Sequence, residues 1–193
     1  MQDLQDRLAI SALIQDWALW RDTGEWEKLR GTVHPDATMT ATWFDGPFDR
    51  FIEACRRRGS RSMHFLGGTT VALRGHRAIA ETRMTIMARG RLDGIDVDVA
   101  CHGRFFDRVE KRSGVWRIAK RNAIYEKDRM DPVDPGATLT LDQPLLERFP
   151  EGYRHLAYLQ TRSGAQVNPS LPTARGEALE TLMAEARAWL AAG

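Results

Sequence analysis

The sequence lacks the features that are typical of disulfide-rich, metal-binding, membrane and secreted proteins. It contains only two cysteines in 193 residues, Cys55 and Cys101, which are too few for a disulfide framework and show no metal-type spacing with histidines or carboxylates. No segment reaches the roughly 20 apolar residues that span a membrane, and the first residues lack the basic and apolar regions of a secretory signal. We therefore expect a cytoplasmic protein with no membrane partner, no metal and no cofactor.

The chain also has no large excess of charge of either sign. The net charge is +2, with 28% charged and 42% hydrophobic residues, which is ordinary for a globular domain. The densest basic run, Arg56-Arg57-Arg58 with Arg61 close behind, has no interleaved aromatic residues. We interpret this run as a solvated helix end and expect no nucleic-acid partner.

The first 58 residues predict three helices and a strand. Apolar residues recur at three- and four-residue spacing over residues 3–21 and predict an amphipathic helix, whose stripe contains Leu4, Leu8, Leu13, Trp17 and Trp20. A short second helix follows, for which Asp22 is a candidate cap and Glu25 its capping-box partner. Residues 37–44 have strand composition, residues 45–47 form a turn, and residues 48–58 predict a third helix.

Long β segments follow. Strands are predicted over residues 69–73, 77–91, 95–109 and 115–127, separated by short loops that contain glycine. Short connections make successive strands antiparallel neighbours, and strands this long must coil. Two or three helices packed on one face of such a curved meander sheet give an α+β half-cone, whose apolar interior can hold a ligand.

The run from Asp131 to Gly136 breaks regular structure. We therefore divide the chain into a domain over residues 1–130 and a C-terminal extension over residues 131–193. The extension predicts a helix over residues 151–160 and another over 174–192, with Thr173 as its N-cap. The last helix carries an apolar stripe that packs either on its own domain or on a neighbouring subunit: Leu179, Leu182, Met183, Ala186, Trp189 and Leu190.

Asp22 and His64 are the main catalytic candidates. Asp22 ends the first helix, where the helix dipole disfavours a negative charge, so it either caps the next helix or has a chemical role. His64 stands among apolar residues before a glycine pair and is either a packed histidine or a base. A carboxylate bonded to one imidazole nitrogen fixes the tautomer and stabilises the imidazolium that forms when the other nitrogen takes a proton. Together the two residues would form a general base.

Three segments carry a family resemblance. They are WRDTGEWEKLR at residues 20–30, HFLGGT at residues 64–69 and SGVWRIAKRN at residues 113–122. They resemble the SnoaL-like group of the nuclear transport factor 2 fold, and within it scytalone dehydratase and hexachlorocyclohexane dehydrochlorinase. The resemblance covers about residues 3–130.

The resemblance implies roles for four residues. Asp22 and His64 correspond to the catalytic aspartate and histidine of the family. Arg121 matches an arginine that stabilises developing negative charge, although its position also suits a solvated strand arginine. His102 lies near a second pocket histidine, although its even spacing from Asp98 places it on a polar face.

The sequence also departs from both relatives. Trp17 stands where the dehydrochlorinase has a lysine, and Arg21 and Ala41 stand where scytalone dehydratase has tyrosines, so we expect a different substrate. An apolar pocket could be lined by aromatic and methionine residues that equally suit a plain core: Trp20, Trp43, Phe44, Phe65, Met84 and Met87.

We therefore predict a cofactor-independent lyase, in the first place a dehydratase, that acts on a small apolar cyclic or carbonyl-bearing substrate. An isomerase or hydratase that uses the same pair is one alternative. A non-catalytic ligand-binding or assembly module, similar to the β subunit of ring-hydroxylating dioxygenases, is another. The resemblance also implies a homodimer or homotrimer.

Overall fold

The computed structural model describes residues 2–59 and 62–193, so Arg61 of the basic run lies outside the described residues. The helices are α1 (Gln2–Thr23), α2 (Trp26–Gly31), α3 (Phe48–Arg58), α4 (Gln143–Leu146), α5 (Arg154–Arg162) and α6 (Glu177–Ala191). The strands are β1 (Val33–Ala41), β2 (Phe44–Pro47), β3 (Ser62–Arg74), β4 (Arg77–Leu92), β5 (Ile95–Arg112) and β6 (Val115–Pro132).

The strands form one six-stranded sheet in the order β2-β1-β6-β5-β4-β3. Strands β3 to β6 make the predicted antiparallel meander. Two of its turns, Asp93-Gly94 and Ser113-Gly114, have positive φ at both central residues, which is the backbone of the tight turns that match strand twist. The sequence analysis did not foresee that β1 would join β6 in parallel.

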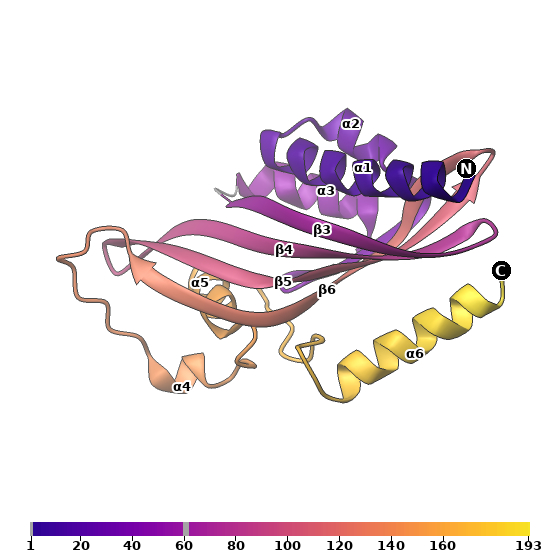
Figure 1. The fold of residues 1–193 in the computed structure, drawn as a ribbon. Helices are drawn as coiled ribbons and strands as arrows, with labels where there is room; N and C mark the ends of the chain where they lie inside the picture. The colour runs from indigo at the N-terminus through magenta and orange to yellow at the C-terminus, as the bar shows by residue number, and fades with distance from the viewer. Residues whose placement is uncertain (1, 60–61) are drawn as a thin grey trace.

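Helices cover both faces of the sheet. Helices α1, α2 and α3 lie on one side and α6 lies on the other (Figure 1). The predicted α+β half-cone with a C-terminal helical extension is therefore confirmed. In the described part of the chain, none of the helices has the length and apolar character of a membrane span.

The predicted stripe of α1 was wrong in its first half. Leu4 and Leu8 are each 62% exposed, because the face turned toward the sheet there carries Asp6. The Asp6 carboxylate accepts hydrogen bonds from Lys111 Nζ (2.9 Å) and Trp116 Nε1 (2.8 Å), which fixes the rotation of the helix. The buried face continues with Ile10, Ile14, Trp17 and Ala18.

The predicted start of the second helix was also wrong. Asp22 lies inside the last turn of α1, and Glu25 occupies the N-cap position of α2 without a side-chain cap bond. The predicted strand over residues 37–44 is divided between β1 and β2, and residues 45–47 belong to β2. Strand β3 begins at Ser62, earlier than predicted, so His64 lies in a strand.

The C-terminal extension packs on both faces of the sheet. The stripe of α6 lies on its own domain, where Leu182 and Ala186 meet Ile79, Phe106 and Ile124. This helix begins after Gly176 rather than at the predicted Thr173 cap, because Thr173 pairs with Tyr125 in a β-bridge. Helix α5 joins the main core through residues that include Tyr153, Leu156 and Leu159.

Gly103 gives a test of the sheet register. It lies where the pairing of β5 with β6 shifts, and a Cβ there would stand 2.1 Å from the Ile124 carbonyl oxygen. Since the backbone must move to admit a methyl group, Gly103→Ala is expected to lower the free energy of unfolding by about 1–3 kcal/mol. Thermal or urea unfolding measures the change. Gly68→Ala, whose Cβ would meet no atom within 4 Å, is the control, and equal losses in the two variants would contradict the register.

Candidate active site

A cavity of about 300 Å³ opens between the N-terminal helices, the sheet and α5. Its wall is mostly apolar and aromatic, as expected of a small-molecule site. The apolar lining residues include Trp17, Trp43, Phe51, Ile86, Phe105, Leu156 and Leu159. Residues of the domain over 1–130 and of the C-terminal extension therefore both form the cavity wall.

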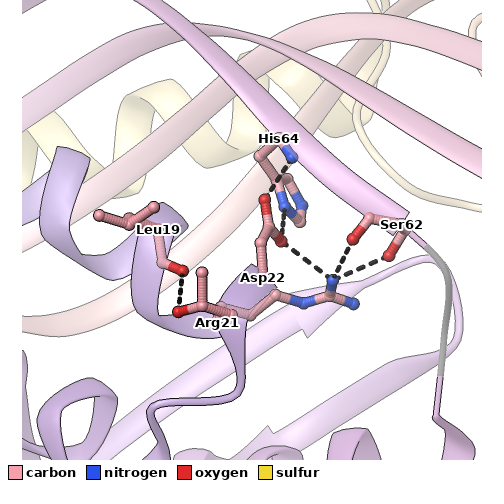
Figure 2. A network of polar contacts seen from close by, with 6 residues as sticks. Leu19, Arg21, Asp22, Ser62 and His64 are labelled. Atoms are coloured by element: carbon pink, nitrogen blue, oxygen red, sulfur yellow. Dashed lines mark hydrogen bonds and ion pairs between the residues drawn. The ribbon is translucent and has the colours of Figure 1, made fainter.

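His64 lines this cavity, and Asp22 contacts it from behind the wall (Figure 2). His64 Nδ1 lies 2.8 Å from Asp22 Oδ1, and the backbone N–H of His64 donates to Asp22 Oδ2 at 2.5 Å. Both carboxylate oxygens thus bind one residue, one through the ring and one through the backbone. This double contact fixes the imidazole relative to the end of α1.

Arg21 supports the carboxylate from the other side. Its Nη1 donates to Asp22 Oδ1 (3.1 Å), to the Ser62 carbonyl oxygen (3.1 Å) and to Ser62 Oγ (2.8 Å), as Figure 2 shows. The guanidinium therefore connects the last turn of α1 to the first residue of β3. It also leaves the dyad with a compensating positive charge.

The surroundings favour a neutral His64 at neutral pH. Its side chain is 7% exposed, and burial lowers the pKa of His64, against the opposing effect of Asp22 and with further help from the charges of Arg21 and Arg121. Burial alone would raise the pKa of Asp22, but its hydrogen bonds from His64 and the positive charge of Arg21 hold it below its ordinary value. The Asp22 contact assigns the ring proton to Nδ1, and no described residue binds Nε2, which keeps its lone pair.

Arg121 lies behind the cavity wall. It is fully buried, and it binds Asp107 through two hydrogen bonds of 2.7 Å each. Its guanidinium carbon stands 4.0 Å from the Trp17 ring centroid and 4.1 Å from that of Phe105. Arg121 is not among the residues that line the cavity, and its positive charge is paired with Asp107.

His102 lies on the other face of the sheet. It pairs with Thr85, and its Nδ1 is 2.9 Å from Thr85 Oγ1. The next pair along the strands is Ile86 with Cys101, and Ile86 lines the cavity. Since side chains alternate along a strand, His102 points away from the cavity, and we leave it out of the catalytic set.

Of the six residues expected to line a pocket, Trp43 lines the cavity, and Phe44 and Met87 do not. Phe65 follows His64 in the strand, points to the opposite face and is 66% exposed. Met84 is buried in the core. Trp20 is half-buried and packs against the same core. Neither of the two is a lining residue.

The sequence analysis missed the part of the wall that comes from late in the chain. Tyr125 of β6 lines the cavity, and its hydroxyl oxygen accepts a hydrogen bond from the Thr42 backbone N–H at 3.2 Å. Leu156, Leu159 and Gln160 of α5 also line it. The sequence predicted a helix here, but no local signal indicated which face of the sheet it covers.

The described residues contain no group of three or more histidine, cysteine, aspartate or glutamate side chains that could hold a metal ion. The contact between Asp22 and His64 is an arrangement that can transfer a proton. A neutral imidazole oriented by a carboxylate can accept a proton at its free nitrogen and return it later.

Comparisons with known proteins agree with this architecture. Residues 2–122 match the SnoaL-like domain family. A PEP2-like protein of Fusarium vanettenii is 32% identical, over 96% of this chain and 85% of the relative.

Two solved structures share the fold. A scytalone dehydratase-like protein from Novosphingobium aromaticivorans superposes with a TM-score of 0.57 at 18% identity, over 72% of this chain and 100% of that one. A type 2 hexachlorocyclohexane dehydrochlorinase superposes with a TM-score of 0.56 at 16% identity, over 72% and 95%. From the family match and the sequence relative, the chain belongs to the SnoaL-like domain family.

Proposed function

We propose that the protein is a cofactor-independent lyase of the dehydratase type, acting on a small cyclic or carbonyl-bearing compound. The observation that carries the proposal is His64, which lines a mostly apolar cavity and is held by Asp22 through its Nδ1. The family and its structural neighbours, which include a dehydratase-like protein and a dehydrochlorinase, support a lyase- or isomerase-type activity. A cytoplasmic location and a homodimer or homotrimer are part of the same proposal.

The reaction begins with proton abstraction. His64 Nε2 takes a proton from a carbon next to the substrate carbonyl, and the C–H electron pair passes into an enolate. Asp22 stabilises the imidazolium that forms, because its carboxylate already accepts the Nδ1 hydrogen bond. Arg121, behind Trp17 and Phe105, adds a weaker stabilisation of the enolate, because its positive charge is paired with Asp107.

Elimination completes the reaction. The enolate electrons form the carbon–carbon double bond as the β-carbon–oxygen bond breaks. The leaving hydroxyl takes the proton back from His64 and departs as water, which restores the neutral imidazole. An isomerase would share the first step and return the proton to a different carbon, so product analysis separates the two reactions.

Hydrogen–deuterium exchange tests the shared first step without knowledge of the true substrate. In D₂O, the protein is expected to catalyse deuterium incorporation next to the carbonyl of simple cyclic ketones such as cyclohexanone, measured by NMR. His64→Ala is expected to lower the rate by about 10²- to 10⁴-fold, the usual contribution of a positioned base. Asp22→Asn is expected to lower it as well, because the ring loses its orientation and its counter-charge.

His76→Gln is the matched control for this test, since His76 is an exposed histidine in the turn between β3 and β4. It is expected to exchange at the wild-type rate. Circular dichroism and the thermal midpoint check that each variant is folded. If folded His64→Ala exchanges deuterium as fast as the wild type, the base assignment is wrong.

The pH dependence of the exchange rate gives a second prediction. The base works only when His64 is neutral, and its pKa lies below the ordinary value of ~6.5. The rate is therefore expected to stay constant as the pH falls to about 6.5 and to drop only at lower pH. Arg21→Gln removes a charge that lowers this pKa, so the drop is expected to move to higher pH. A wild-type drop centred above pH 7 would contradict the neutral base.

A further inference from the structure

The permanently charged side chains that line the cavity are those of Arg21, Arg58 and Arg89. No aspartate or glutamate is among the described lining residues. A cavity whose fixed charges have one sign attracts ligands of the opposite sign. The three arginines differ in whether a carboxylate of the protein already binds them.

Two of the three arginines already have carboxylate partners. Arg21 binds Asp22 and Ser62 as described above. Arg89 binds Asp98 through two parallel hydrogen bonds of 2.7 and 2.6 Å. The donors that each arginine turns toward its carboxylate are therefore occupied.

Arg58 differs from both. In residues 2–59 and 62–193 it forms no ion pair with a carboxylate, and its guanidinium carbon lies 4.5 Å from the centroid of the Trp43 ring. Trp43 is itself held by stacking on Phe51, at 5.7 Å between ring centroids and an interplanar angle of 27°. A guanidinium that rests on a ring face keeps its in-plane N–H groups free for an anion.

From this arrangement we infer that Arg58 is a substrate-binding residue and that the substrate is a small ring compound bearing a carboxylate. The carboxylate would accept hydrogen bonds from the Arg58 N–H groups, and the apolar ring would lie in the cavity beside Trp43 and Phe51. The inference rests on the proposed function and names the substrate class of the same site. Bidentate pairing with a carboxylate suits the geometry of arginine better than that of lysine.

A matched pair of probes tests this inference. One is 4-oxocyclohexanecarboxylate and the other is its methyl ester, which has the same ring and ketone but no charge. Binding is measured by quenching of tryptophan fluorescence, since Trp17 and Trp43 line the cavity, and is checked by NMR titration. The wild type is expected to bind the acid at least ~10-fold more tightly than the ester, as befits a hydrogen bond between charged groups.

Three variants locate the effect. Arg58→Gln is expected to bring the acid-to-ester preference close to one without weakening the ester. Arg58→Lys keeps the charge and is expected to retain part of the preference. Arg57→Gln is the control, because Arg57 is an exposed neighbour on α3 that does not line the cavity and its loss changes the net charge equally.

The inference is overturned if the wild type binds neither probe, if it binds acid and ester equally, or if Arg57→Gln loses as much preference as Arg58→Gln. The outcome is independent of the exchange reaction. Loss of the acid preference with His64-dependent exchange intact removes the role of Arg58 alone. An intact acid preference without exchange removes the proposed function and leaves a binding site for cyclic acids.

Discussion

The double contact between Asp22 and the residue His64 is the interaction on which the site depends. Asp22 uses one oxygen for the imidazole and the other for the backbone of β3, so the same carboxylate orients the imidazole and joins α1 to the edge of the sheet. Arg21 repeats this connection through Ser62. A negative charge at a helix C-terminus, unfavourable in isolation, is stabilised here by these partners.

The extension beyond the family match completes the cavity. Helix α5 brings Leu156 and Leu159 to the wall that contains His64, while α6 covers the opposite face of the sheet. Gly90 permits this approach, because a Cβ there would stand 2.7 Å from a methyl group of Leu159.

Local patterns in the sequence predicted the third helix and the meander, because turn residues and apolar spacing act over a few positions, and the family resemblance pointed to Asp22 and His64. They failed where the outcome depends on tertiary contacts. The spacing of Leu4 and Leu8 predicts burial, but the hydrogen bond from Trp116 to Asp6 turns a different face of the helix toward the sheet. Whether Phe65 and His102 point into the cavity depends on which face of the sheet their side chains occupy. Whether α5 lines the cavity depends on which face of the sheet it covers. The parallel pairing of β1 with β6 joins segments far apart in the chain, which no local signal reveals.

The protonation state of His64 tests most directly whether Asp22 holds a neutral imidazole in one tautomer. Imidazole ¹⁵N NMR of the folded protein at pH 7 distinguishes the two neutral tautomers from the cation, with His64→Gln used to assign the signals. The account predicts a neutral ring with its proton on Nδ1, and a loss of that fixed tautomer in Asp22→Asn. A charged ring at pH 7, a proton on Nε2, or a signal unchanged by Asp22→Asn would contradict it.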